Sequence, residues 1–588
     1  MFYRSHLAER ARKGERLLVI ADNASSAAQV RPLLPPGPHG LIATSRKALP
    51  GIGRPRSLHQ LQPDDAVTLL DLALREADPG DLRVREDREA AEKVVTACGC
   101  LPLALQIVAA LLVQDPGQPL AERAARLTAG EGRLDSLDDG ERDLRTVFDQ
   151  TFESLTPQQQ DLFRLLSLNA GPDISTAAAA ALTHQTSTAI DHQLGRLAAA
   201  HMLNRGATRG RWQMHDLLRD YAEEQAAAHV ADNRPARRKY DQARGRLVDY
   251  YVKWGEAGLT HVELSSGQLQ PSPEFADRDA AMRWMDDEWG NLVGMAHATA
   301  PSTATARLSV VLIPYLQHRH LWDDALAVAA LGLDSVRTMG DHRNEPGGWG
   351  NLGRVLFGLS RYEEALEAST TARDLSRRIG NVTGEATALH NVGSALRKLT
   401  RYEEALDALA TALELNERIG DISRQAAVWN ERGNVLNDTG RHEEALAAHR
   451  SGCALSEQVA YPYGMAINRN NMGTALRALG RYEEAVAEGR VAAETLEGEG
   501  DLTRAGEAYA ELATTLAMSG APTAQVRDTW LRSASCYEAA GAADKARESR
   551  AKAEGDADGA DVEGADADRA KPDRPDADRA DADRADAD

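Results

Sequence analysis

The feature that most constrains this chain is a repeat with a period of 40 residues in its C-terminal half. The sequence Arg-Tyr-Glu-Glu-Ala-Leu, or a close variant of it, begins at Arg361, Arg401, Arg441 and Arg481. Periods of about 20 to 50 residues are typical of proteins that stack one supersecondary unit on the next. The repeat therefore predicts an elongated array of similar units instead of a single globular core.

Each repeat carries small residues at fixed positions. A glycine precedes every motif, in Asn351-Leu-Gly353, Asn391-Val-Gly393, Glu431-Arg-Gly433 and Asn471-Met-Gly473. After it come two small residues seven apart, as in Ala365 and Ala372. Positions i and i+7 lie two turns apart on one face of a helix. The spacing predicts two helices per repeat, the first carrying its glycine where a neighbouring helix approaches closely.

This pattern resembles the tetratricopeptide repeat, in a form of about 40 residues. The resemblance covers residues 341–550, and residues 313–340 look like a worn further copy. A coiled coil would require heptads, which this pattern lacks. The resemblance implies an α-solenoid that binds a protein or a peptide.

We expect the inner face of the solenoid to be lined by the first helix of each repeat. Counted from each glycine at spacings of four and seven, the candidate peptide-binding residues share polar side chains. They are His390, Ser394, Arg397, Asn430, Asn434, Asn437, Asn470, Thr474 and Arg477. Amide and guanidinium groups can bond the backbone or a carboxylate of an extended peptide. The alternative is that these residues are only the solvated walls of a groove.

Two short apolar runs near the N-terminus predict strands. The first, Arg16-Leu-Leu-Val-Ile-Ala-Asp22, reads as a buried parallel strand with a carboxylate at its C-terminal edge. The second, Gly40-Leu-Ile-Ala-Thr-Ser-Arg46, ends in hydroxyls and a guanidinium. Ligands of open α/β sheets bind at this edge, although a charged residue can also simply cap a strand.

Two further motifs follow in order along the chain. Cys98-Gly-Cys-Leu-Pro102 lies inside a helical pattern, where the proline must begin or kink a helix. Met214-His215-Asp216 follows a predicted two-strand wing, from Met202 to Gln213. Taken alone, His215 could be no more than a helix cap.

Together the four motifs resemble the nucleotide-binding core of NB-ARC proteins, a group within the signal-transducing ATPases with numerous domains. The resemblance covers about residues 3–225, and the repeats suit the bacterial regulators of this group. It implies that Asp22 orients Mg²⁺ and that Arg46 lies near the terminal phosphate. It also implies that Pro102 lies beside adenine and that His215 touches the β-phosphate of ADP and holds a closed state.

The resemblance and the repeats together divide the chain into six segments. We expect a partial α/β P-loop-NTPase subdomain (1–60), a small helical domain (61–135) and a winged-helix domain (140–228). A helical connector with a degenerate repeat (235–340), the tetratricopeptide solenoid (341–550) and a disordered acidic tail (551–588) follow. The expected fold class is mostly α.

One element of the NB-ARC pattern is missing from the sequence. No G-x-x-x-x-G-K-S/T loop precedes Asp22, and in the family the amides and lysine of that loop hold the phosphates. Asn23 stands where many family ATPases carry a second acid. We therefore expect no ATP hydrolysis, and no tight binding of the ADP or ATP with Mg²⁺ that intact relatives hold. Truncation of a longer regulator and natural loss of the loop both stay open.

Composition sets the remaining expectations. A formal net charge of −21 argues against general binding to nucleic acid or to an anionic membrane. Four cysteines are too few for a disulfide framework, and no Cys or His spacing suggests a metal site. The N-terminus lacks the apolar core of a secretory signal, and no run reaches the roughly 18 apolar residues of a membrane helix. We expect a cytoplasmic protein, and a homo-oligomer stays open.

Three functions follow as hypotheses. The first is a regulator of signalling or transcription, in which ligand binding to the repeats releases an ADP-held clamp. The second is a plain peptide-binding scaffold with no nucleotide role. The third is a DNA-binding regulator that uses the winged helix. The third is disfavoured because the candidate recognition helix, Thr188 to Met202, carries one arginine, Arg196.

Overall fold

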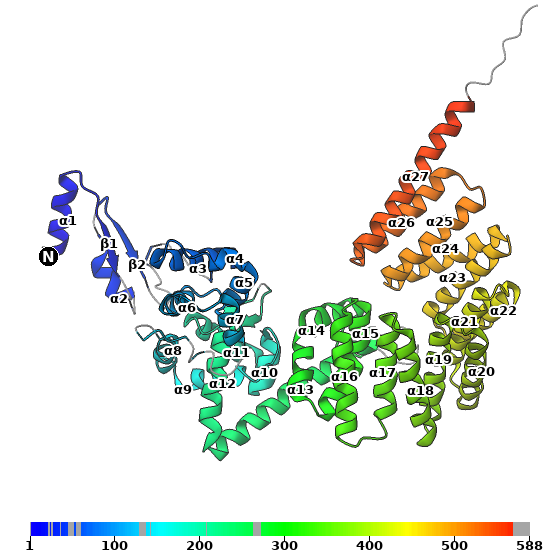
Figure 1. Ribbon diagram of the computed structural model, residues 1–588, viewed down its shortest axis with the longest axis horizontal. Helices are drawn as coiled ribbons and strands as arrows, with labels where there is room; N and C mark the ends of the chain where they lie inside the picture. The colour runs from blue at the N-terminus through cyan, green and yellow to red at the C-terminus, as the bar shows by residue number, and fades with distance from the viewer. Residues whose placement is uncertain are drawn as a thin grey trace, which may run out of the picture. The chain divides into compact units, whose positions relative to one another are not determined.

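The computed structural model describes residues 2–21, 24, 27–35, 37–44, 52–53, 60–128, 134, 137–140, 143–206, 208–262 and 272–567. The fold is mostly α-helical (Figure 1). The chain separates into two compact units, Met1–Gly258 with Glu274–Leu312 and Leu259–Pro273 with Ile313–Asp588. Each unit is described by itself below. The six segment boundaries predicted from the sequence stay predictions.

The first unit begins with a small parallel sheet. Strands β1 (Leu18–Ala21) and β2 (Gly40–Ala43) pair in register, Leu18 with Gly40 and Ala21 with Ala43. Along the chain, helix α1 (Phe2–Arg12) precedes β1, and helix α2 (Ala27–Val30) and the 3₁₀ turn η1 (Arg31–Leu33) lie between the two strands. Both strands lie where the sequence predicts them, and they are parallel as predicted.

The predicted burial of these strands is wrong. Leu18, Ile20 and Ile42 are 59%, 67% and 52% exposed. A parallel strand is buried only when other elements cover both faces of its sheet. In the described residues β1 pairs with β2 alone, and alternate side chains of both strands stay in contact with solvent.

Residues 60–128, named here the helical segment, form five helices. They are α3 (Pro63–Ala77), α4 (Arg83–Glu86), α5 (Arg88–Ala97), α6 (Pro102–Gln114) and α7 (Leu120–Thr128). Pro102 is the first residue of α6, a position that suits proline because its missing N–H would have no helical partner. The tight turn between α5 and α6 holds both Gly99 and Cys100 at positive φ.

Residues 143–231, named here the three-strand segment, combine five helices with a small antiparallel sheet. The helices are α8 (Leu144–Glu153), α9 (Pro157–Leu166), α10 (Thr176–Thr183), α11 (Ser187–Ala199) and α12 (Asp216–Ala231). The strands β3 (Ile174–Ser175), β4 (Asn204–Arg205) and β5 (Arg211–Gln213) lie in the order β3-β5-β4. The core contains the fully buried ring of Trp212 and a cluster of Phe148, Phe152, Phe163 and Tyr221.

Buried charge joins the three-strand segment to α14 (Arg278–Thr299). Arg211 pairs with Asp173 and donates to Glu288 on α14 at 2.7 Å. Glu288 is 1% exposed and also accepts from Asn291. Burial raises the pKa of Glu288, and the neighbouring Arg211 opposes that rise. Removing one member of such a network leaves an uncompensated buried charge, so the network fixes the place of α14 in this unit.

The second unit is a solenoid of helix pairs. The boundaries between the two units fall within α13 (Arg234–Val262) and α15 (Thr303–His318). The helix pairs of the repeats are α17 (Glu345–Gly358) with α18 (Tyr362–Arg378), α19 (Val382–Lys398) with α20 (Tyr402–Ile419), α21 (Ile422–Asp438) with α22 (His442–Gln458), α23 (Pro462–Ala478) with α24 (Tyr482–Gly498), and α25 (Leu502–Met518) with α26 (Thr523–Ala539). Helix α16 (Trp322–Thr338) precedes these pairs and α27 (Ala543–Ala567) follows them. Each helix packs on its neighbours along the chain, as the ribbon shows (Figure 1). The predicted α-solenoid with two helices per repeat is confirmed.

The glycine of each first helix lies against the second helix of the same repeat. A Cβ added to Gly393 would lie 2.6 Å from Cγ of Leu409, and one added to Gly433 would lie 2.5 Å from Cε1 of His449. The close approach predicted for these glycines is therefore present. Gly473 faces another glycine, Gly489. A Cβ added to Gly473 would lie 3.5 Å from its nearest neighbour, the carbonyl oxygen of Ala485.

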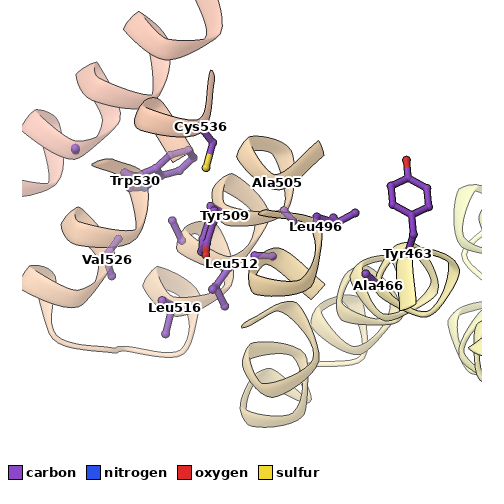
Figure 2. Close-up of a cluster of buried hydrophobic side chains, with 14 residues drawn as sticks. Tyr463, Ala466, Leu496, Ala505, Tyr509, Leu512, Leu516, Val526, Trp530 and Cys536 are labelled. Atoms are coloured by element: carbon purple, nitrogen blue, oxygen red, sulfur yellow. The ribbon is translucent and has the colours of Figure 1, made fainter. Parts of the chain in front are cut away.

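Apolar side chains fill the spaces between helices at the C-terminal end of the solenoid. Leu496, Tyr509, Leu512 and Trp530 come from three successive helices and meet in one buried cluster (Figure 2). The sulfur of Cys536 belongs to the same cluster, and all four cysteines are free thiols. Burial raises the pKa of Cys536 to about 11, as expected for a thiol that packs as a small apolar side chain.

The predicted disorder of the acidic tail needs correction in part. Helix α27 continues to Ala567, whereas the sequence pattern predicts disorder from residue 551. Alanine has the highest helix propensity, and a helix satisfies its own backbone hydrogen bonds without an apolar face. Ala553 is also buried against the preceding helices. Residues 568–588 lie outside the described part of the chain.

Candidate functional site

The candidate site is a groove on the inner side of the solenoid, with a volume of about 660 Å³. First helices of successive repeats contact one another, α19 with α21 and α21 with α23, and so form a continuous wall. The groove runs from Phe357 on α17 to Arg504 and Glu507 on α25. Its place agrees with the inner face predicted from the repeat.

Six of the nine predicted peptide-binding residues line this groove. They are His390, Ser394 and Arg397 on α19, Asn430 and Asn434 on α21, and Asn470 on α23. Helical spacing puts them on one face of each helix, and the stacking of repeats brings the three faces together. Whether they bind a peptide stays a prediction.

The other three predicted residues lie outside the lining of the groove. Nδ2 of Asn437 lies 3.5 Å from Nε2 of His449, and Arg477 forms an ion pair with Glu511. Thr474 is half-buried. Asn437 and Arg477 lie towards the C-terminal ends of α21 and α23, where their side chains meet neighbouring helices.

A buried carboxylate on α21 organises the groove. Glu431 accepts a hydrogen bond of 2.7 Å from Nε of Arg397 and one of 3.1 Å from Nδ2 of Asn434. Arg397 also donates to Asp438 at 2.8 Å. Burial by itself would raise the pKa of Glu431, but the Arg397 guanidinium reverses this effect and holds the pKa below its usual value. The carboxylate therefore stays ionised and fixes the Arg397 side chain across two helices.

Two histidines border this carboxylate. Burial lowers the pKa of His390, and Glu431 only partly offsets the effect. Burial also lowers the pKa of His449 to about 4, although Glu431 and Asn468 oppose the shift. Both rings are consequently neutral at physiological pH, and Nδ1 of His390 is a buried atom without a hydrogen-bond partner in the described residues.

Within the part of the chain that the structure describes, the acidic side chains of the groove are all neutralised by ion pairs, whereas one of its basic side chains is not. Both of its acids are paired, Glu431 with Arg397 and Glu507 with Lys545 at 2.7 Å. Lys398 has no ion-pair partner among the described residues. Arg504 pairs with Asp501 at 3.7 Å, and its guanidinium lies 5.5 Å from the centre of the Tyr463 ring. Lys398 therefore gives the groove one positive charge that no described acid neutralises, within a strongly acidic protein.

Asparagine side chains supply most of the neutral hydrogen-bonding capacity. Asn430 accepts from Nδ2 of Asn471 at 2.9 Å, which leaves the amide group of Asn430 as a donor. The side chain of Asn470 makes no hydrogen bond with another described residue. An asparagine amide both donates and accepts, so it can pair with a peptide group as another backbone would.

Repeat periodicity alone did not identify every residue of the groove. The lining residues that were not predicted from the repeat include Lys398, Glu431, Tyr463 and Arg504. Glu431 did carry a signal, because it occupies the position at which the other three repeats have Asn351, Asn391 and Asn471. Arg504 and Tyr463 carried none, since they reach the groove from the ends of different repeats.

The four residues predicted to hold a nucleotide fall into two groups. Asp22 and Arg46 lie outside the described residues. Pro102 begins α6, and three residues earlier the carbonyl oxygen of Gly99 lies 2.8 Å from Nε2 of His215. The structure therefore brings His215 beside the turn that leads into Pro102. In the described residues no cluster of three His, Cys, Asp or Glu side chains could hold a metal ion.

Comparison with known proteins agrees with the repeat architecture. Residues 347–418 match a family model described as tetratricopeptide repeat. The chain is 35% identical over 301 residues to regulatory protein AfsR of Streptomyces griseus and 35% identical over 313 residues to that of Streptomyces coelicolor. These alignments cover 49% and 51% of this chain, and they span only 30% of each relative.

One solved structure aligns with nearly the whole chain. It is a STAND protein with a tetratricopeptide repeat sensor from Pyrococcus horikoshii, with 14% identity, 94% coverage of this chain and 82% of the other. Its TM-score of 0.35 is too low to support an argument from its arrangement. None of the helices among the described residues combines the length and apolarity needed to cross a lipid bilayer. The chain therefore contains tetratricopeptide repeats and is related in sequence, over about half its length, to bacterial regulatory proteins named AfsR.

Proposed function

We propose that this chain is a regulatory signalling protein whose tetratricopeptide groove binds an extended segment of a protein partner. The observation that carries the proposal is the groove itself, in which six polar residues predicted from the repeat line one continuous hollow. The sequence relationship to regulatory proteins supports the regulatory role.

The size of the groove suits a short extended peptide. Neighbouring first helices in such a stack lie roughly 8–10 Å apart, so the wall from α19 to α25 spans on the order of 25–30 Å. An extended chain advances about 3.3 Å per residue, which corresponds to about eight or nine residues. Amides of Asn430 and Asn470 would bond its backbone, as a strand partner does.

The charge of the groove favours a peptide that carries acidic side chains. Glu431, Glu507 and Arg504 are already paired, while Lys398 has no acid partner among the described residues and is available to a ligand. Long-range repulsion from the −21 chain would slow the approach of such a peptide, and the local cations would offset this once it is bound.

Within this proposal the first unit responds to what the repeats bind. The order of motifs supports a switch of the NB-ARC kind, in a chain that lacks the P-loop sequence, and the AfsR relationship supports a regulatory role. We propose that the chain does not hydrolyse ATP. A scaffold that binds peptides without any switch is the alternative, and it shares the same groove.

The groove is tested by selecting displayed random nonapeptides on the full-length chain and measuring their affinities by fluorescence anisotropy. Each hydrogen bond to a peptide contributes about 1 kcal/mol, so the double variant N430A/N470A should bind roughly 30-fold more weakly. The variant Lys398→Glu should lose binding to acidic peptides most. Thr474→Ala, on α23 outside the groove, serves as the matched control and should leave affinity unchanged.

Two results would contradict the proposal. One is that selected peptides bind N430A/N470A as tightly as the unmodified chain. The other is that Lys398→Glu prefers the same acidic sequences, which would move the binding surface elsewhere on the solenoid.

A further inference from the structure

Both nitrogens of the His215 ring are occupied by protein groups. His215 caps the N-terminus of α12, where its Nδ1 accepts a hydrogen bond of 3.1 Å from the backbone N–H of Leu217. A neutral imidazole whose Nδ1 accepts must carry its proton on Nε2. That Nε2 lies 2.8 Å from the carbonyl oxygen of Gly99 and donates to it.

Gly99 is shaped to receive this ring. It has a φ of +57°, a left-handed conformation that residues other than glycine rarely adopt. A Cβ at this position would lie 1.7 Å from Nε2 of His215 and 1.8 Å from Cε1, closer than any non-bonded contact allows. Backbone conformation and contact with the ring therefore both require glycine here.

The contact joins two segments that are far apart in the sequence. Gly99 belongs to the helical segment and His215 to the three-strand segment, 116 residues later. Beside the contact lies a cleft of about 430 Å³, lined by Glu89, Glu92, Lys93 and Asp216 among others. Lys93 is paired with Glu89 at 2.7 Å, so carboxylates dominate this cleft. Excess negative charge does not suit a polyphosphate.

These observations do not fit the role that the NB-ARC resemblance implies for His215, which is contact with the β-phosphate of ADP. We infer that His215 holds the helical segment to the three-strand segment directly through Gly99, as a latch that closes without nucleotide. The inference does not depend on what the solenoid groove binds.

Asparagine at position 215 separates the latch from the helix cap. The Oδ1 of asparagine can accept from the N–H of Leu217 as Nδ1 does, but the side chain is too short to reach Gly99. Hydrogen exchange of the full-length chain followed by mass spectrometry reports on the turn at residues 98–101. A lost hydrogen bond of about 1 kcal/mol corresponds to roughly five-fold faster exchange there in His215→Asn.

Glycine variants test the steric half of the latch. Gly99→Ala should speed hydrogen exchange of the same turn, because the new methyl group clashes with the His215 ring. Adding His215→Ala to this variant should bring little further change, because the ring that the methyl group meets is then absent. Gly140→Ala is the matched control, since Gly140 has a φ of +85° with no atom within 4 Å of an added Cβ. His192→Asn, on the exposed side of α11, controls for loss of an imidazole. Unchanged exchange of α9 and α10, which belong to the same unit as the turn, shows that each variant is folded.

ADP with Mg²⁺ distinguishes the latch from a phosphate contact. The latch predicts that 1 mM ADP with Mg²⁺ leaves exchange of residues 98–101 and 214–218 unchanged in the unmodified chain. Slower exchange with ADP that disappears in His215→Asn would overturn the inference. Exchange in His215→Asn equal to that of the unmodified chain would overturn it too, as would strictly additive effects of the Gly99 and His215 variants.

Discussion

At the scale of single residues, small differences between equivalent repeat positions give the solenoid its chemistry. Glu431 stands where other repeats have asparagine, and it recruits Arg397 from the preceding repeat at 2.7 Å. His449 stands where the preceding repeat has Leu409, and it is fully buried. Both differences in sequence place a titratable side chain next to the groove.

The burial of His449 makes the stability of the solenoid depend on pH. Burial lowers the pKa of His449 to about 4, against 6.5 for an exposed histidine. The unfolded chain therefore binds more protons at intermediate pH, so stability is complete above about pH 6.5 and falls as pH decreases towards 4. The full loss is roughly 3 kcal/mol.

Urea unfolding followed by circular dichroism at pH 7.5 and pH 5.0 measures this effect. The midpoint of the unmodified chain should decrease more between the two pH values than that of His449→Leu, which copies the preceding repeat. His342→Leu changes an exposed histidine and should keep the full decrease. Equal decreases in the unmodified chain and in His449→Leu would show that His449 does not titrate as described.

At the scale of helices, the repeated spacing of small residues sets how closely the two helices of a repeat approach. Gly393 faces Leu409, and no room is left there for a methyl group. Gly473 faces Gly489, and a methyl group would fit at that position. Exposed pairs such as Arg401 with Glu404 and Arg441 with Glu444 recur at the start of each second helix. Ion pairs as exposed as these contribute little to stability, so the fold depends on packing rather than on them.

Alanine substitution at equivalent glycines tests this packing. Gly393→Ala should destabilise the solenoid by about 1–3 kcal/mol, because the new methyl group forces Leu409 to move. Gly473→Ala should be neutral or stabilising by up to about 1 kcal/mol, because alanine is the better helix former. Thermal unfolding of the two variants side by side gives the comparison, and a Gly473→Ala chain as unstable as Gly393→Ala would contradict this account.

At the scale of the whole molecule, the two units differ in how completely their elements are covered. The helices of the solenoid pack on both sides along the chain. In the described residues, β1 and β2 form a sheet of two strands with exposed Leu18, Ile20 and Ile42. A sheet this small is marginally stable, because it buries too little apolar surface to offset the loss of chain entropy.

Hydrogen exchange across the full chain should therefore find residues 18–21 and 40–43 among the fastest of the hydrogen-bonded amides. Amides in α19 to α23 should exchange at least 100-fold more slowly, in proportion to a difference of about 3 kcal/mol in opening free energy. Equal protection in the two regions would show that another part of the chain stabilises the sheet.

Periodicity and short motifs were enough to predict the solenoid, its two helices per repeat, the parallel strand pair and six of the residues that line the groove. These features depend on spacing along the chain, which helix and strand geometry convert directly into shared faces. The exposure of β1 and β2, the pairing of Glu431 with Arg397, and the contact of His215 with Gly99 did not follow from spacing. Each depends on which distant surfaces pack together, and burial, charge pairing and steric fit at those surfaces arise only when the chain has folded.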